Sequence, residues 1–247
     1  MQNPDEKQLL EEKYGGVASA AFEADRKRLS TGEPLAYVIG WVSFLGLRIY
    51  LDSHPLIPRP ETEWWTEQML SKITTIYGSN FTGTFLDVCA GSGAIGCAIL
   101  KQVPDALVSF GELEPRHEAT IRKNIRENGL DESRADIRIG DLFAPFAGES
   151  FDIIAANPPY VPEDRVLPAS VADFEPAEAL RGGGDGLAFI RRIAQDTPAH
   201  LNKGGELWME CDAGHANEAL ALVRAGGAKR VTLSTDPYGR PRCIVAH

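Results

Sequence analysis

Four consecutive residues, Asn157-Pro158-Pro159-Tyr160, follow an apolar run at 151–154 and combine hydrogen-bond acceptors with a rigid backbone. Neither proline has an N–H group, so two prolines in a row fit a position where a buried strand has just ended. Asn157 offers a side-chain carbonyl, and Pro158 offers a backbone carbonyl that Pro159 keeps in an extended conformation. Tyr160 adds a ring that can pack on a flat group.

Two converging carbonyl acceptors suit the N–H groups of a planar nitrogen, as in an amide or an aromatic amine. Such a nitrogen is a poor nucleophile because its lone pair is delocalised. The stretch therefore predicts methyl transfer to a planar nitrogen that the protein holds in line with an activated methyl group, without a covalent intermediate or a metal ion. No residue is assigned as a general base, and the product proton is expected to leave through water. The alternative is a proline-rich turn that only leaves a strand.

A second stretch, DVCAGSGAIG at 87–96, places a glycine turn between an expected strand and an expected helix. Gly91 and Gly93 allow a tight turn and a close approach of backbone N–H groups to a ligand. An acid about twenty positions further on would hold ribose hydroxyls; Glu112 fits this position and Glu114 competes with it. By itself the pattern also fits a nicotinamide or flavin dinucleotide, or a glycine turn without a ligand.

Two acids favour S-adenosylmethionine over the other nucleotides. Asp87 lies four residues before Gly91, where its carboxylate can orient the turn and approach the amino-acid part of the ligand. Asp141 follows the third expected strand, beside Leu142 and Phe143. A carboxylate can accept from the exocyclic amine of adenine while Leu142 or Phe143 covers the ring. Asp141 alternatively caps a helix or a turn.

Strands that alternate with helices position these residues, and this order predicts an α/β fold with right-handed crossovers. Strands are expected at 84–90, 106–114, 135–141, 151–157, 205–211, 230–235 and 241–247, with helices at 91–103, 115–128, 187–200 and 215–225. The last two strands have no helix between them, so an antiparallel pair is expected at one edge.

The first part of the chain has a different pattern. Residues 5–29 have helical spacing with a break at Gly15-Gly16, and 32–52 predict a β-hairpin that turns near Leu45-Gly46. A proline-rich loop at 55–65 leads through Thr62 and Glu63 into a helix that ends near residue 77. We therefore divide the chain into a short helical segment (1–31), a hairpin, loop and linking helix (32–78), and a catalytic domain (79–247).

Composition narrows the classes of function. The 247 residues include 25 basic and 35 acidic side chains, a net charge of −10 that argues against extended contact with a phosphate backbone. No apolar stretch reaches the length of a membrane span, and the polar N-terminus lacks an export signal, so a cytoplasmic protein is expected. Four cysteines without a Cys-x-x-Cys pair predict buried thiols in a reducing compartment rather than a metal site.

Several stretches occur in the order typical of one family. They are GEPLAYVIGWVSFLG (32–46), LIPRPETE (56–63), LDVCAGSGAIGCAIL (86–100), NPPY (157–160), FEPAEAL (174–180) and GGGDGL (182–187). Over roughly residues 30–247 the chain resembles the HemK/PrmC family, the protein-(glutamine-N5) methyltransferases that modify peptide chain release factors. NPPY alone is shared with methyltransferases that act on amino groups of DNA and RNA, whereas the PRPETE, FEP and GG.DGL stretches are more specific.

The resemblance implies a class I methyltransferase fold with a seven-stranded sheet, and S-adenosylmethionine as the methyl donor. It implies that the acceptor is the glutamine amide in the Gly-Gly-Gln motif of a release factor, held by Asn157, Pro158 and Pro159 with Tyr160 nearby. It places the loop at 58–63, with Arg59 and Glu61, beside the donor and acceptor sites. A monomer that binds a protein substrate, but neither nucleic acid nor membrane, is expected.

The chain departs from the family pattern at two places. The helical segment before the hairpin is shorter than the family's N-terminal domain, which helps to hold the release factor. The stretch MECDAGHA at 209–216 lacks the usual glutamate-x-glycine pattern and is given only a structural role. Three other functions remain open: a DNA or RNA amino-methyltransferase, a nicotinamide-dependent oxidoreductase, and a binding protein that keeps the fold without activity.

Overall fold

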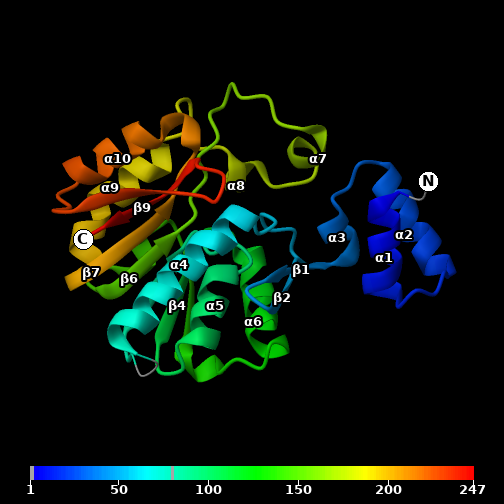
Figure 1. Ribbon diagram of the computed structural model, residues 1–247, viewed down its shortest axis with the longest axis horizontal. Coiled ribbons are helices and arrows are strands. Elements are labelled where there is room, and N and C mark those ends of the chain that lie inside the picture. Colours follow the sequence, from blue (N-terminus) through cyan, green and yellow to red (C-terminus); the bar gives the residue numbers. More distant parts are fainter. Residues whose placement is uncertain (1–2, 79–80) are drawn as a thin grey trace.

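A computed structural model describes residues 3–78 and 81–247 and contains a seven-stranded mixed sheet (Figure 1). The strands run in the order β5-β4-β3-β6-β7-β9-β8. They are β3 (Thr84–Val88), β4 (Leu107–Glu112), β5 (Ala135–Ile139), β6 (Phe151–Ala156), β7 (Leu201–Glu210), β8 (Val231–Thr235) and β9 (Pro241–Ala246). β3 to β7 pair in parallel, while β9 is antiparallel to both β7 and β8. The predicted antiparallel pair at one edge is confirmed.

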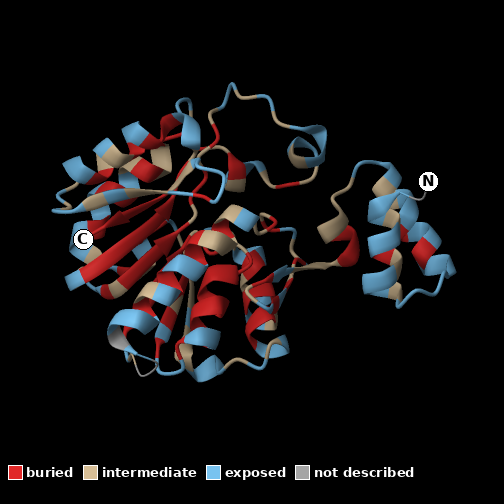
Figure 2. Cartoon of the chain, in the orientation of Figure 1, coloured by how far each residue is buried: buried red, intermediate tan, exposed pale blue. Residues whose placement is uncertain are grey.

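Helices cover both faces of the sheet, so the central strands are buried on both sides (Figure 2). On one face lie α4 (Pro60–Tyr77), α5 (Ala94–Gln102) and α6 (Glu118–Glu127), and on the other lie α9 (Ala188–His200) and α10 (Ala216–Ala225). Adjacent residues of a strand belong to different core clusters, as with Phe85 and Leu86 or Ile153 and Ile154. The α/β fold with a seven-stranded sheet that the sequence predicts is confirmed.

The first helices lie apart from the sheet, beside the hairpin and the loop that carries α7 (Figure 1). α1 (Pro4–Tyr14) and α2 (Ala20–Ser30) flank the predicted break at Gly15, which adopts a left-handed conformation. The hairpin consists of β1 (Trp41–Phe44) and β2 (Leu47–Tyr50), with Leu45 and Gly46 both at positive φ, as a tight hairpin turn requires.

The prediction that 32–52 is extended throughout was wrong at its beginning. A short helix, α3 (Leu35–Ile39), follows Pro34 and ends at Gly40, whose φ is +98°. Its Val38 and Ile39 are buried against α1 and α2. Tertiary packing therefore overrides the strand preference of these β-branched residues.

The remaining elements of the described residues are short. They are α7 (Ala169–Ala172), α8 (Ala177–Leu180) and four 3₁₀ turns, η1 (Pro115–His117), η2 (Glu132–Arg134), η3 (Ala144–Phe146) and η4 (Ala213–His215). The boundary predicted between residues 78 and 79 falls where the described residues stop, and residues 1–2 of the first predicted segment also lie outside them. Within the described part of the chain, no helix combines the length and apolar character needed to cross a bilayer.

Candidate active site

The pairing register brings the chemically important residues to one edge of the sheet. Val88 pairs with Gly111 and with Ala156, and Ala156 pairs with Met209. The residue that follows each of these positions therefore lies at the same level of the sheet: Cys89, Glu112, Asn157 and Glu210. The chain adds β4 and β5 on one side of β3 and then returns to add β6 on the other side. The carboxyl ends of β3 and β6 therefore form the switch point where open α/β sheets bind ligands.

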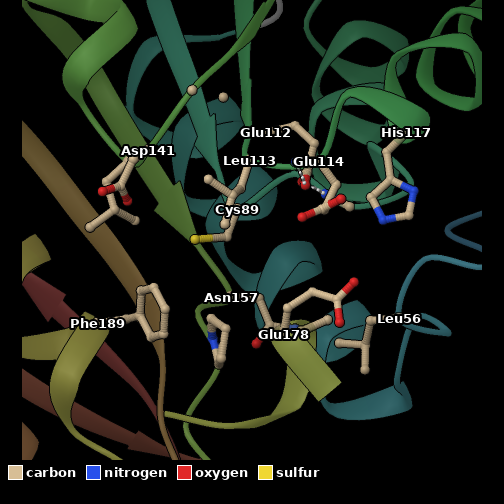
Figure 3. A pocket seen from close by; sticks show the side chains of 16 residues that line it. Leu56, Cys89, Glu112, Leu113, Glu114, His117, Asp141, Asn157, Glu178 and Phe189 are labelled. Carbon is tan, nitrogen blue, oxygen red and sulfur yellow. Dashed lines mark hydrogen bonds between the residues drawn. The ribbon is translucent and has the colours of Figure 1, made fainter. Parts of the chain in front are cut away.

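A first cavity, here called the Glu112 cavity, opens at this edge (Figure 3). Among the residues predicted to hold a cofactor, Gly91, Glu112, Asp141, Leu142 and Asn157 line it, and Pro159 does so too. In Figure 3, Asp141 and Phe189 lie at one end of the cavity and His117 and Leu56 at the other. The cavity is thus lined by residues that follow four neighbouring strands, β3, β4, β5 and β6.

Glu112 ends β4 and holds the glycine turn in place. Its Oε2 accepts from the N–H of Gly91 at 2.7 Å, and its Oε1 accepts from the N–H of Glu114 at 2.9 Å. Burial raises the pKa of Glu112, while these backbone donors act in the opposite direction. Each carboxylate oxygen keeps a second lone pair, so Glu112 can still accept from hydroxyl groups of a ligand.

Asp87 lies beneath the glycine turn and Gly93 lies within it, and neither residue lines the cavity. Asp87 is fully buried, and its Oδ2 accepts from the N–H of Gly96 at 2.9 Å. Gly93 has a φ of +76°, and a Cβ there would lie 3.0 Å from Ile121. Both residues shape the turn, and a direct contact of either one with a ligand stays a prediction.

We expect Asp87 to make stability depend on pH. Burial raises the pKa of Asp87 to about 8, from 3.8 for an ordinary aspartate. Between these values the folded state binds a proton that the unfolded state does not bind. The free energy of unfolding should therefore fall by on the order of 1 kcal/mol per pH unit as the pH rises from about 4 to about 8.

Denaturant unfolding of the wild type and of Asp87→Asn across this range isolates the effect, because other titrating groups cancel in the difference. The asparagine variant keeps an acceptor for Gly96 but cannot ionise. A difference in unfolding free energy that stays constant with pH would contradict the expectation.

Asp141 lies at the mouth of the Glu112 cavity and forms an ion pair with Arg192 of α9 at 2.6 Å. Leu142 beside it has a φ of +49° and is buried at the cavity wall. Phe143 stacks instead on His200, with ring centroids 4.7 Å apart. Of the two residues predicted to cover a ligand ring, Leu142 is therefore the one at the cavity.

A second cavity, here called the Tyr160 cavity, meets the first at Leu56, Asn157 and Ala179. Its lining is mostly apolar, including Leu56, Val161 and Leu180, and its polar groups come from Arg59, Asn157, Pro158 and Tyr160. The Nδ2 of Asn157 donates to the Oγ1 of Thr62 at 3.3 Å. Within the described residues, neither the Oδ1 of Asn157 nor the carbonyl oxygen of Pro158 accepts a hydrogen bond.

The two predicted residues of the proline-rich loop are placed differently. Arg59 lines the Tyr160 cavity and forms an ion pair with the buried carboxylate of Glu175, which also accepts from the N–H of Ile57. Glu61 lines neither cavity and pairs with Arg240 at 2.9 Å. The loop is therefore fixed to the segment 174–180 through Arg59.

Glu210 is a residue that sequence reasoning missed at this site. It is fully buried at the end of β7 and accepts from Thr62 at 2.6 Å, Trp65 at 2.8 Å and Tyr160 at 2.9 Å. Burial raises the pKa of Glu210, while its three donors and Arg242 act in the opposite direction. The sequence did contain a signal for Glu210, an acid directly after the apolar run Leu207-Trp208-Met209. The register between β6 and β7 places this acid beside Asn157.

His117 is a second missed residue, at the wall of the Glu112 cavity. Its Nδ1 lies 2.8 Å from the hydroxyl of Ser53, and burial lowers the pKa of His117 to about 4. The ring is therefore neutral at pH 7. Its place in the first turn after Pro115 gave no signal that distinguishes it from a structural histidine.

The charges of the side chains around the Glu112 cavity indicate which kind of nucleotide it can bind. Four carboxylates line it, those of Glu112, Glu114, Asp141 and Glu178; Asp141 is paired with Arg192 and Glu178 with Arg116. A pyrophosphate would meet like charges here, whereas a positively charged ligand with hydroxyl groups would meet acceptors. At Gly91 a Cβ would find no neighbour closer than 4.0 Å, which leaves room at the turn. The residues present therefore fit S-adenosylmethionine and disfavour a dinucleotide.

Comparison with known proteins agrees with this geometry. Residues 66–185 match the methyltransferase small domain family. The chain is 35% identical to a release factor glutamine methyltransferase of Geobacter sulfurreducens over 219 residues, which are 88% of this chain and 74% of the relative. It is also 35% identical to the protein of the same name from Cereibacter sphaeroides over 231 residues, 93% of this chain and 80% of the relative.

Among solved structures, a methyltransferase from Pyrococcus furiosus superposes with a TM-score of 0.60 at 16% identity. The match covers 91% of this chain and 98% of the other. At this identity the likeness concerns the fold, and it agrees with the strand order and the helical layers described above.

Proposed function

Since this chain belongs to the family of release factor glutamine methyltransferases, we propose that it methylates N5 of the glutamine in the Gly-Gly-Gln motif of a peptide chain release factor. One observation carries the proposal: Asn157 lies where the Glu112 cavity and the Tyr160 cavity meet. A cofactor in the first cavity and an amide in the second would then both touch this side chain.

The cofactor is S-adenosylmethionine, which supplies a methyl group activated by a positively charged sulfur. Glu112 would hold its ribose hydroxyls, and Asp141 and Leu142 would bind its adenine. Gly91 would let the backbone approach it closely. Asp87 and Gly93 would act through the shape of the turn.

The acceptor amide would enter the Tyr160 cavity with its aliphatic stem against Leu56, Val161 and Leu180. The free Oδ1 of Asn157 and the free carbonyl of Pro158 would accept its two N–H hydrogens. These acceptors would stabilise positive charge that grows on the nitrogen during transfer. Tyr160, whose hydroxyl is held by Glu210, would present its ring to the same cavity. Arg59 lines this cavity too, whereas Glu61 would contribute only at the surface.

The protein partner would be the release factor itself, and the protein would work as a monomer in the cytoplasm, where translation termination takes place. The net charge of −10 supports a protein rather than a nucleic acid as substrate.

Incubation with methyl-labelled S-adenosylmethionine and, separately, release factor, tRNA and DNA tests the proposal. We expect label only in the release factor, and mass spectrometry should find one added methyl group on the glutamine of its Gly-Gly-Gln peptide. Label in tRNA or DNA would instead support an amino-methyltransferase of nucleic acids. Absence of label from all three, with the cofactor bound, would support a binding protein without activity.

Replacement of Glu112 by glutamine is expected to weaken cofactor affinity by about 10- to 100-fold. The variant keeps one acceptor oxygen but places an NH₂ group against a backbone N–H, and a hydrogen bond to a charged group contributes about 1.5–3 kcal/mol. Calorimetric titration with S-adenosylhomocysteine measures the change. Glu118→Gln is the matched control, since Glu118 lines neither cavity and pairs with Arg122 on the exposed side of α6. Equal affinities for the two variants would contradict the role of Glu112.

A further inference from the structure

Thr62 connects the buried carboxylate of Glu210 to the amide of Asn157. Its hydroxyl lies 2.6 Å from the Oε2 of Glu210 and 3.3 Å from the Nδ2 of Asn157. Thr62 is itself buried, in the first turn of α4. These three residues come from α4, from the end of β7 and from the segment after β6, and up to 148 positions separate them in the chain.

The donors around Glu210 fix the direction of each hydrogen bond between Glu210, Thr62 and Asn157. The indole N–H of Trp65 can only donate, and it donates to the same Oε2 that Thr62 contacts. A carboxylate oxygen that accepts from an indole is a natural acceptor for the Thr62 hydroxyl as well. Thr62 has one hydrogen, and once this hydrogen points to Glu210 its oxygen can only accept from the other side.

Within the Asn157 side chain, only the NH₂ group can donate to Thr62. The opposite end of the amide, the Oδ1, must then point away from Thr62 and towards the junction of the two cavities. If the amide were turned by 180°, its NH₂ would face the incoming N–H groups of the acceptor. Two donors would then oppose each other, and the nitrogen of the substrate would lose an acceptor.

We propose that Thr62, oriented by Glu210, is a positioning residue that fixes which way round the Asn157 amide lies. The inference deepens the proposed function and rests on it for its kinetic consequence. Its structural consequence, the orientation of one amide, does not depend on any substrate. Thr62 does not line either cavity, so it acts on the acceptor through its hydrogen-bond partners, of which Asn157 lies at the junction of the two cavities.

Thr62→Val removes the hydroxyl and keeps the shape of the side chain. We expect kcat to fall about 10- to 30-fold because nothing then holds the Asn157 amide in its orientation or in its place beside the acceptor, and small displacements of a positioning group lower a rate strongly, while the affinity for S-adenosylhomocysteine changes less than threefold. Thr62→Ser keeps the hydroxyl and should restore kcat to within about threefold of the wild type. The matched control is Thr66→Val: Thr66 is equally buried one turn later in α4, and its hydroxyl donates only to the carbonyl of Thr62.

A second readout needs no activity. The side-chain amide signals of Asn157 in a ¹⁵N–¹H spectrum are assigned by their loss in Asn157→Ala. We expect these signals to shift in Thr62→Val and to stay in place in Thr62→Ser and Thr66→Val. Unchanged signals in Thr62→Val would overturn the inference, as would a kcat equal to that of the wild type. A wild type that leaves the release factor unmethylated would count against the proposed function alone, and the spectra would still decide the orientation.

Discussion

Asn157→Ala is expected to lower kcat for methylation of the release factor by on the order of 10²–10³-fold, the usual effect of removing one preorganised hydrogen-bonding group from an active site. The side chain lies at the junction of the two cavities, and its Oδ1 has no partner among the described residues. The acceptor oxygen would therefore be lost where charge develops on the substrate nitrogen. Positive charge grows on the nitrogen in the transition state and makes its N–H groups stronger donors, so the transition state depends on this acceptor more than the flat ground state does.

Single-turnover rates, measured together with calorimetric titration of S-adenosylhomocysteine, separate chemistry from cofactor binding. We expect the cofactor affinity of Asn157→Ala to remain within about tenfold of the wild type, since Glu112 and Asp141 still line the first cavity. Asn202→Ala is a suitable control. Asn202 lies at the beginning of β7, away from both cavities, and its side chain donates to Asp152 of β6. A rate for Asn157→Ala within a factor of ten of the control would refute the role of this side chain.

Most of the fold could be predicted because its signals are local. The helical break at Gly15, the turn at Leu45-Gly46 and the alternation of strands and helices all depend on residues that lie close together in the sequence. One exception, α3, has β-branched and aromatic residues that favour a strand. Its helical state depends on contacts of Val38 and Ile39 with α1 and α2, which no local pattern reveals.

The site could be predicted only in part, for the same reason. Gly91, Glu112 and Asn157 stand at strand ends, so topology alone brings them together. The roles of Thr62 and Glu210 depend instead on a hydrogen bond between residues 148 positions apart. Spacing could not distinguish Asp87, which is buried below the glycine turn, from an acid at the cavity wall.

The GGGDGL stretch was recognised only by resemblance, and the structure gives it a physical role. Val161 donates to the carbonyl of Leu180, and Gly182 donates to the carbonyl of Val161, so this segment runs directly against the end of NPPY. A Cβ at Gly182 would lie 2.7 Å from the carbonyl oxygen of Pro159. The glycines therefore permit a close backbone approach that sets the position of Pro159 and Tyr160.

The strongest test of this support is Gly186→Ala. Gly186 has a φ of +75°, and a Cβ there would lie 2.5 Å from the carbonyl oxygen of Tyr160, so the backbone of one segment or the other must move. A displacement of the acceptor site by about 1 Å can lower a rate by about 10²-fold, and we expect a loss of kcat of this size. Methylation rates and thermal unfolding, measured on the same preparations, check it.

Two alanine variants separate the causes. Gly184→Ala changes the same loop at a position with no neighbour within 4 Å and no positive φ, and it should keep the wild-type rate. Gly204→Ala introduces an alanine at a φ of +87° with no neighbour within 4 Å, so it carries the backbone strain without the close approach. We expect it to lower the unfolding temperature but not kcat. Gly186→Ala could instead lose stability, as Gly204→Ala does, and keep the wild-type kcat. The position of the NPPY segment would then not depend on Gly186, and the close approach would contribute to stability but not to catalysis.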